Sequence, residues 1–215
     1  MLTVCWSVKG GVGSTVVSAL LALGHARMSP EGAVAIGLDD DLAMALGASV
    51  SSTAGFAEWT CTEDPPPDAL ARLATKVGSG LHVIGAGAGE LCLDHLASRA
   101  RELEMTTRPV VVDVGNASAP VITHLTTAAS SSLLVVRSCY LGLRRCQDLP
   151  AEPTGVVLVS EPGRSLTCRD VEAVIGVPVV AQIEVDPAVA RLVDAGLLTT
   201  RLPRSLSRTI EAVIR

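Results

Sequence analysis

The chain of 215 residues and 22.1 kDa carries a formal net charge of −5, so the molecule as a whole is not attracted to nucleic acid or to an anionic membrane. Hydrophobic residues make up 48% of the chain but aromatic residues only 2%, which predicts a core of Val, Leu, Ala and Ile. Such a core favours parallel strands with helices on both faces, and the length suits one α/β domain over residues 1–215.

A glycine-rich segment near the start follows one apolar run and precedes another. The first run, 2–8, is short enough for a buried strand, and the second, 16–23, fits a packed helix. Glycines let backbone N–H groups surround a phosphate, and the first helical turn adds unpaired donors, so the segment predicts an anion site. Its residues are Lys9, Gly10, Gly11, Val12, Gly13, Ser14 and Thr15. Thr15 stands where a P-loop has its Mg²⁺-binding hydroxyl, but Ser14 replaces the lysine that holds the β- and γ-phosphates.

An apolar strand predicted over 33–38 runs directly into Asp39, Asp40 and Asp41. Carboxylates at the carboxyl end of a strand lie where open α/β sheets bind ligands. The same residues could instead begin a helix over 42–46, as N-cap or first-turn acids. The triplet alone leaves both interpretations open.

The middle of the chain carries weaker signals. Residues 47–68, which contain a run of three prolines, are predicted to be irregular, and a helix containing Lys76 is predicted over 68–77. A strand over 81–84 leads into alternating glycines at 85–89. These glycines do not form a dinucleotide fingerprint, because Glu90 stands in place of the third glycine, so a flexible turn before a helix over 90–104 is predicted.

A second apolar strand, 110–113, ends in a carboxylate. An apolar strand that delivers Asp113 to the coordination shell of a metal is typical of a Walker B element, and the N–H of Gly115 could reach a γ-phosphate. A solvated Asp at a strand end is equally common, so both interpretations stay open for this strand taken alone.

The rest of the chain continues the alternation of strands and helices. Strands are predicted over 133–136, 155–159 and 178–183, and helices over 118–130, 141–149 and 167–175. Thr167 and Asp170 resemble a capping box, and a further helix runs from Asp186-Pro187 to a stop at Gly196. The sequence therefore predicts βα units on one parallel sheet.

Six cysteines stand at 5, 61, 92, 139, 146 and 168, without C-x-x-C spacing. They are predicted to be buried, small apolar residues in a reducing compartment. We find no signal-peptide pattern and no apolar run near the roughly 18 residues of a membrane span, so a cytoplasmic location is expected.

At six of seven positions, residues 9–15 match the loop K-G-G-x-G-K-[ST] of the ParA/MinD family of deviant Walker A P-loop ATPases, and the chain resembles this family. The strand ending in Asp39 is similar to the family's switch I, and Asp113 with Gly115 to its switch II. The TadZ/CpaE-like branch, which positions pili, is the most similar in character.

The resemblance implies a three-layer α/β/α fold with a mostly parallel sheet, ATP and Mg²⁺ as cofactors, and a nucleotide-dependent homodimer. It implies that Lys9 reaches the partner's nucleotide and that Asp39 positions the attacking water. It further implies that Thr15, Asp39 and Asp113 serve the metal and that the loop and Gly115 bind the phosphates. Only two of the 17 basic residues are lysines, so the lysine at 9 suggests a need for a compact ammonium group.

The chain also departs from the family pattern. Ser14 removes the second lysine, Gly37 replaces a frequent Asp, and Ser160-Glu161 stands where adenine-contacting Asn-Arg is frequent. One lost phosphate contact costs about 1.5–3 kcal/mol, or about 10- to 150-fold in affinity. Hydrolysis, in which charge builds up on the γ-phosphoryl group, suffers more than binding.

Two functions follow from the resemblance. One is a nucleotide-gated spatial organiser for chromosome or plasmid partition, septum-site or pilus positioning, with weak ATP hydrolysis and an unidentified protein partner. The other is a non-hydrolysing scaffold or adaptor. DNA could bind basic residues near the end of the chain. Residues 188–215 contain five arginines and only two acidic residues, Asp194 and Glu211, so this segment has a charge of +3. The arginines are Arg191, Arg201, Arg204, Arg208 and Arg215. An apolar stripe over 206–214 is better explained by packing on the body than by binding a membrane.

Overall fold

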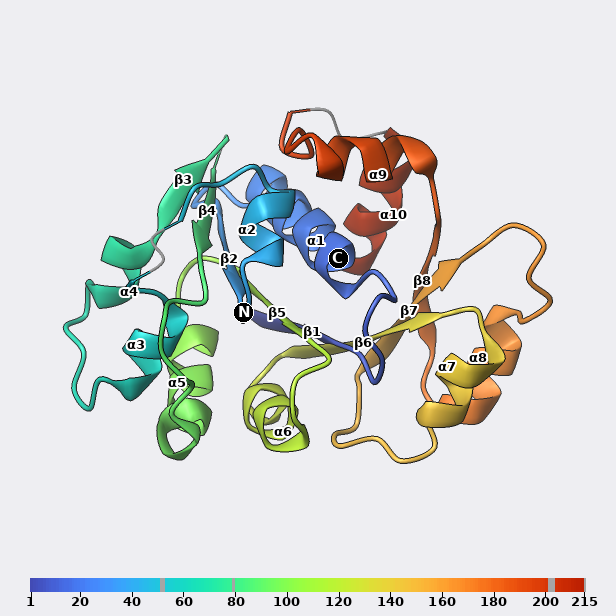
Figure 1. The fold of residues 1–215 in the computed structure, drawn as a ribbon, viewed down its shortest axis with the longest axis horizontal. Helices are drawn as coiled ribbons and strands as arrows, with labels where there is room; N and C mark the ends of the chain where they lie inside the picture. The colour runs from blue at the N-terminus through green and yellow to red at the C-terminus, as the bar shows by residue number, and fades with distance from the viewer. Residues whose placement is uncertain (51–52, 79, 201–203, 215) are drawn as a thin grey trace.

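The computed structural model describes residues 1–50, 53–78, 80–200 and 204–214, and its strands form one sheet (Figure 1). The strands are β1 (Leu2–Trp6), β2 (Ala33–Gly37), β3 (Thr75–Val77), β4 (Leu81–Ile84), β5 (Val110–Gly115), β6 (Ser131–Arg137), β7 (Gly155–Ser160) and β8 (Val179–Glu184). Their order is β3-β4-β2-β5-β1-β6-β7-β8, and every neighbouring pair except β3 and β4 is parallel. The predicted mostly parallel α/β sheet is confirmed.

Helices cover both faces of this sheet (Figure 1). One face carries α1 (Ser14–Met28), α2 (Asp41–Ala45), α9 (Pro187–Asp194) and α10 (Arg204–Ile214). The other carries α3 (Phe56–Cys61), α4 (Ala69–Leu73), α5 (Leu93–Glu104), α6 (Ala119–Thr127), α7 (Tyr140–Arg145) and α8 (Cys168–Ile175). The strands separate two apolar clusters, because successive side chains point to opposite faces: Cys5 of β1 belongs to one cluster, and Val4 and Trp6 to the other.

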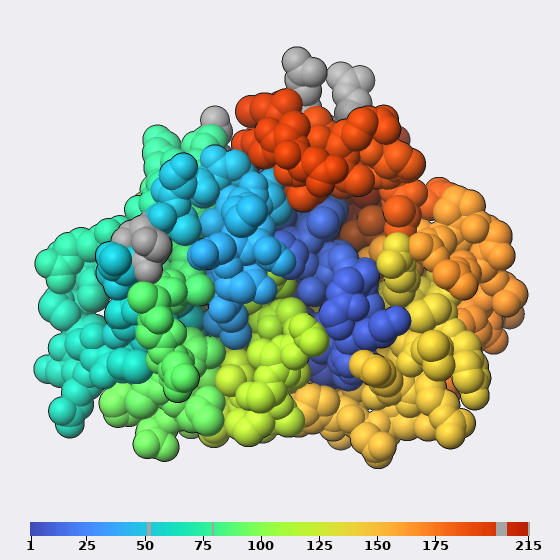
Figure 2. Space-filling view, viewed as in Figure 1, coloured from blue at the N-terminus to red at the C-terminus, as the bar shows by residue number. Residues whose placement is uncertain are grey.

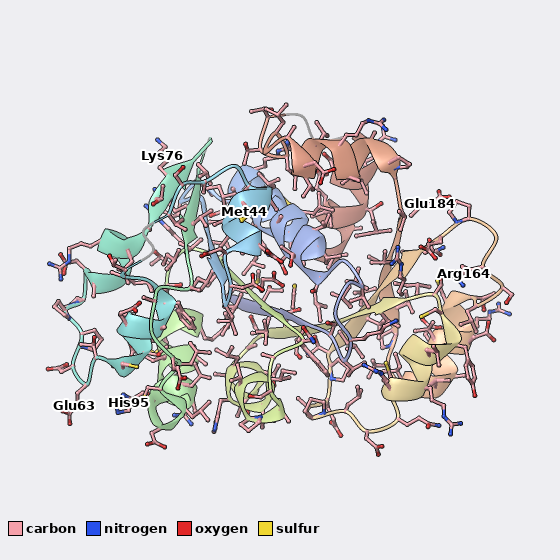
Figure 3. All side chains as sticks on the ribbon, viewed as in Figure 1. Met44, Glu63, Lys76, His95, Arg164 and Glu184 are labelled. Atoms are coloured by element: carbon pink, nitrogen blue, oxygen red, sulfur yellow. The ribbon has the colours of Figure 1, made fainter. Side chains whose placement is uncertain are left out.

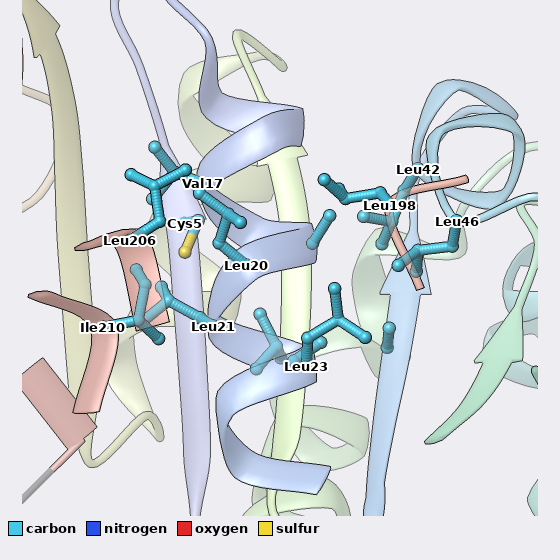
Figure 4. Packing of buried hydrophobic residues seen from close by; sticks show 14 of the residues in the cluster. Cys5, Val17, Leu20, Leu21, Leu23, Leu42, Leu46, Leu198, Leu206 and Ile210 are labelled. Atoms are coloured by element: carbon cyan, nitrogen blue, oxygen red, sulfur yellow. The ribbon is translucent and has the colours of Figure 1, made fainter. Parts of the chain in front are cut away.

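The last helix packs on the first. Leu206 and Ile210 of α10 are buried against Leu20 and Leu21 of α1 (Figure 4). A Cβ atom added at Gly24 of α1 would lie 2.5 Å from Ile214 Cδ1 and 2.6 Å from Ile210 Cγ2, so the glycine permits the close approach. The apolar stripe predicted over 206–214 thus covers the body of the protein. Within the ranges given above, no helix is both long and apolar enough to cross a membrane.

The single helix predicted over 68–77 is wrong. Helix α4 ends at Leu73, and residues 75–77 form β3, which pairs antiparallel with β4. Two of its three residues, Thr75 and Val77, are β-branched and favour a pleated strand. Lys76 points outward from this edge (Figure 3), where a charged side chain protects an unpaired strand.

The irregular stretch predicted over 47–68 is partly wrong, because it contains α3. Phe56 and Trp59 of this helix are buried beside α5, so tertiary packing stabilises a helix that local composition disfavours. The Glu58 carboxylate accepts hydrogen bonds from the N–H groups of Gly55, Ala88 and Gly89 at 2.7, 3.0 and 2.8 Å. These bonds fix the glycine turn after β4, and α5 begins at Leu93, three residues later than predicted.

The predicted helix starts at Thr167 and Asp186 are confirmed. Asp170 accepts hydrogen bonds from the N–H and hydroxyl of Thr167, and Asp186 accepts one from the N–H of Ala188 at 2.7 Å. The prediction of buried cysteines holds only in part. All six are free, Cys5 and Cys146 are buried, and Cys61 is exposed at the end of α3.

Candidate functional site

Three neighbouring strands bring the predicted site residues to one edge of the sheet. In the parallel registers, Asp113 of β5 lies beside Gly37 of β2 and Cys5 of β1. The backbone continues this pairing beyond the strands, since Leu38 N–H donates to the Asp113 carbonyl at 3.2 Å and Ser7 N–H to the Gly115 carbonyl at 2.7 Å. The glycine loop after β1, Asp39 after β2, and Asp113 and Gly115 at the end of β5 therefore converge.

The loop presents backbone donors to solvent. Gly11 and Gly13 adopt φ angles of 74° and 98°, which residues with a Cβ rarely adopt. Gly13 caps α1 without a side-chain hydrogen bond, and the first turn contains no acidic residue. The dark-blue segment around the loop lies exposed in the middle of the face shown in Figure 2. The N-terminus of α1 thus has the geometry that suits an anion.

Two hydroxyl side chains of α1 lie next to the buried Asp113 carboxyl. The Ser18 hydroxyl lies 3.0 Å from Asp113 Oδ1 and 2.9 Å from the Ser14 carbonyl oxygen, and the Thr15 side chain is near enough to lower the pKa of Asp113. Burial raises the pKa of Asp113 from 3.8 to about 6; these hydrogen bonds lower it, and the Asp39 charge raises it further.

A divalent cation beside Thr15 would offset the unfavourable burial of the ionised Asp113 carboxylate, because the positive charge stabilises the ionised form. Oxygen ligands of this kind suit Mg²⁺, which keeps several waters and uses phosphate oxygens for the rest. Within the described ranges, no group of three or more acidic, His or Cys residues could hold a metal alone. The Thr15 hydroxyl and the Asp113 carboxyl supply oxygen ligands of the kind that Mg²⁺ prefers, so these residues fit this metal.

The three aspartates after β2 include both a helix start and a carboxylate near the site, which were the two interpretations that the sequence left open. Helix α2 begins at Asp41, and Asp40 makes no side-chain capping bond. The Asp39 carboxylate instead accepts the N–H of Asp41 at 3.1 Å. Partial loss of hydration raises the pKa of Asp39, and the neighbouring Asp40 and Asp41 charges add to this rise. Asp39 is thus the member of the triplet that interacts with Asp113.

Lys9 and Ser14 differ in their access to solvent. Lys9 is half-buried, and among the described residues no carboxylate lies within 4.0 Å of its ammonium group. Ser14, in the position of the ordinary P-loop lysine, is only 9% exposed. Its side chain ends at a hydroxyl one bond from Cβ, so the loop has no cation at this position.

The sequence analysis assigned no role to Arg137, which contacts the loop from the end of β6. Its Nη1 donates to the Gly11 carbonyl at 3.3 Å, and its Nη2 lies 2.6 Å from Glu161 Oε1. Glu161 also pairs with Arg164 at 2.8 Å, and the two arginines lower the pKa of its carboxyl, Arg164 more strongly. The available signal was a charged residue at the carboxyl end of an otherwise apolar strand, beside the strand that leads into the loop.

A pocket of about 180 Å³ adjoins the loop. Its walls come from the loop, from α1, from the ends of β7 and β8, and from α9 and α10. The lining includes Gly11, Val12, Gly13, Val16, Val17, Leu20, Arg137, Val159, Ile183, Val185, Asp186, Val189 and Leu206. Most of these side chains are apolar, so the pocket suits an apolar group next to the loop.

Of the arginines proposed to contact DNA, Arg191 on α9 and Arg208 on α10 are exposed. Arg204 begins α10, and Arg201 and Arg215 lie outside the described residues.

No family model matches the chain, and no curated protein matches it. Solved structures do. A ParA family ATPase from Chlorobium tepidum superposes with a TM-score of 0.79 at 17% identity, over 98% of this chain and 96% of the other. The MinC:MinD cell division complex of Aquifex aeolicus gives 0.77 at 14% identity, over 99% and 93%. The septum site-determining protein MinD of Pyrococcus horikoshii, in complex with Mg-ADP, gives 0.74 at 16% identity, over 99% and 94%.

The chain has the ParA/MinD fold. These similarities extend over nearly the whole length of both chains, so the ParA/MinD fold accounts for the sheet from β1 to β8 and for its helices. At such low identity they concern the fold, and the roles of individual residues rest on the local geometry described above.

Proposed function

We propose that this protein binds ATP with Mg²⁺ at the loop of residues 9–15. The observation that carries the proposal is the position of Thr15 and Ser18 beside the buried Asp113 carboxyl, at the base of a glycine loop that caps α1. The bound Mg-ADP of the P. horikoshii MinD, which has the same fold, supports the choice of ligand. The apolar pocket beside the loop fits the adenine ring.

Each site residue has a role in this proposal. The N–H groups of the loop, Lys9 to Thr15, and of Gly115 bind the phosphates. Thr15, Asp113 and Asp39 would hold Mg²⁺, directly or through its water. Asp39 orients the attacking water, and its exposed position leaves room for one. Lys9 extends to the nucleotide of a second copy of the chain, which is consistent with its lack of an ion pair within the described part of the molecule.

At the cellular level, we propose a cytoplasmic ParA/MinD-type spatial organiser of the TadZ/CpaE-like kind. ATP closes a homodimer, the dimer recruits a protein partner, and slow hydrolysis resets the system. The MinC:MinD complex is a precedent for partner recruitment by a protein of this fold. DNA is a second candidate partner, and the exposed Arg191 and Arg208 would form the surface that binds it.

A non-hydrolysing scaffold is the second candidate function, and Ser14 is the observation that favours it. Without a cation at this position, charge that develops on the γ-phosphoryl group lacks one preorganised partner. ATP would then stabilise a fixed dimer instead of driving a cycle.

One set of variants tests these functions: wild type, Lys9→Ala, Ser14→Lys and Asp39→Ala, each with Mg-ATP. Calorimetry measures binding, light scattering after gel filtration measures dimerisation, and phosphate release measures turnover. We expect wild type to bind ATP at micromolar concentrations, Lys9→Ala to lose the ATP-dependent dimer, and Ser14→Lys to raise turnover. Turnover in wild type no higher than in Asp39→Ala favours the scaffold, and no binding of ATP by wild type refutes both functions.

A further inference from the structure

We propose that Arg137 binds a phosphate oxygen of the nucleotide and supplies the positive charge that the loop lacks at Ser14. This inference rests on the proposed binding of ATP. It concerns a residue from a different strand, β6, which lies next to β1 in the sheet and therefore ends beside the loop.

The first observation is the position of the guanidinium group. Its Nη1 already contacts the loop through the Gly11 carbonyl, and Arg137 lines the pocket beside Gly11 and Gly13. The Arg137 guanidinium therefore already lies beside the loop, and it can reach a ligand bound to the loop without a change of fold.

The second observation is an unsatisfied donor. Arg137 Nε is buried and has no hydrogen-bond partner among the described residues. A buried charged donor without a partner is costly, and such groups in native proteins call for a bound water, ion or ligand. Nε and Nη2 of Arg form a fork of parallel N–H groups; in Arg137, Nη2 pairs with Glu161, so Nε is the donor of this fork that remains for a ligand.

The third observation is the charge around Arg137. Glu161 pairs with Arg137 and Arg164 together, so the three side chains keep one net positive charge. Two other acidic side chains, Asp186 and Glu184, line the same pocket as Arg137. Asp186 already caps α9 through the N–H of Ala188, and Glu184 is exposed on the same side of the molecule as Arg164 (Figure 3). Arg137 is the one basic side chain among the described residues that line the pocket, so its guanidinium is the side-chain group there that attracts an anion.

The test is a double-mutant cycle on Mg-ATP affinity with wild type, Arg137→Gln, Ser14→Lys and the double variant, measured by calorimetry in one buffer. Removal of one charge-assisted phosphate contact should weaken binding by about 10- to 150-fold in Arg137→Gln. A lysine at 14 makes the second cation redundant, so the double variant should bind within about threefold of Ser14→Lys alone. A merely structural role of Arg137 predicts the same loss in both backgrounds.

Arg169→Gln is the matched control, because it removes an exposed cation of α8 that lies outside the pocket lining and outside the ion pairs found among the described residues, and its affinity should stay within about threefold of wild type. Circular dichroism shows whether each variant is folded. If Arg137→Gln is unfolded, Arg137→Lys replaces it in the cycle; Lys keeps the charge but loses the fork, so we expect a smaller loss that Ser14→Lys again removes.

Three outcomes overturn the proposal. The first is an Arg137 variant that binds ATP as tightly as wild type, and the second is a loss that Ser14→Lys leaves unchanged. In both, the proposed binding of ATP stands and only the role of Arg137 fails. The third is wild type that binds no ATP, which refutes the proposed function as well.

Discussion

Replacement of Asp113 by Asn should stabilise the ligand-free protein. Asp113 is 3% exposed, and burial raises its pKa from 3.8 to about 6. At neutral pH the Asp113 carboxyl is therefore ionised in the folded protein, in a buried environment that favours its protonated form. This shift corresponds to a destabilisation of about 3 kcal/mol, since one pKa unit is worth about 1.4 kcal/mol. Asn keeps an oxygen for the Ser18 hydroxyl and carries no charge.

The pH dependence distinguishes this cause from general repacking. The destabilisation is fully present above pH 6 and is lost as the pH falls below 3.8, where the carboxyl is protonated in both the folded and the unfolded chain. We therefore expect Asp113→Asn to melt about 6–12 °C above wild type at pH 7.5 in EDTA, and the difference to vanish near pH 4.

Thermal melts by circular dichroism at pH 7.5, 6, 5 and 4 measure this difference. Asp40→Asn is the matched control, because Asp40 is exposed in the same region, and it should leave the melting temperature nearly unchanged. With Mg-ATP the order should reverse, since the wild-type carboxylate gains a cation and Asn does not. A lower melting temperature for Asp113→Asn at pH 7.5, or an increase that does not depend on pH, would refute the reasoning.

Other parts of the structure give further predictions. Gly24→Ala should lower the free energy of unfolding by about 1–3 kcal/mol in urea titrations, because its Cβ would overlap Ile210 and Ile214; greater stability would contradict this packing. Burial, and to a lesser extent the N-terminal amino group, lower the pKa of His25 from 6.5 to about 4, so its contribution to stability is complete above pH 6.5 and is lost as the pH falls to 4. This loss is about 3 kcal/mol, and His25→Asn should remove that part of the acid sensitivity relative to wild type. For the DNA surface, Arg191→Glu/Arg208→Glu should abolish salt-sensitive binding of duplex DNA in gel-shift assays, and undiminished binding would exclude these residues.

The sequence was most informative where local pattern and fold agree. Parallel strands buried on both faces appear as continuous apolar runs, so 110–113 and 133–136 could be recognised without any structure. Helix caps are local as well, which is why Thr167 and Asp186 were placed correctly. The convergence of Asp39 and Asp113 followed from a general property of parallel sheets, whose carboxyl ends meet at one edge.

The features that the sequence did not predict depend on tertiary contacts. Strand β3 has three residues, too few to show the alternation of apolar and polar residues by which a strand is recognised, and its stability comes from pairing with β4. Helix α3 depends on the burial of Phe56 and Trp59 against α5. Ser18 and Arg137 belong to no short motif, and their contacts with Asp113 and Gly11 join positions 95 and 126 residues apart. Only the assembled sheet shows that they border the site.

The packing of α10 on α1 has a consequence for the order in which the binding site matures. During synthesis the glycine loop leaves the ribosome early, whereas Leu206, which closes one wall of the apolar pocket, leaves it late. The glycine loop and the apolar pocket beside it therefore become complete at different times. Under the proposed function, the loop could bind phosphate before α10 docks, whereas the wall that is proposed to contact the adenine ring would form only afterwards.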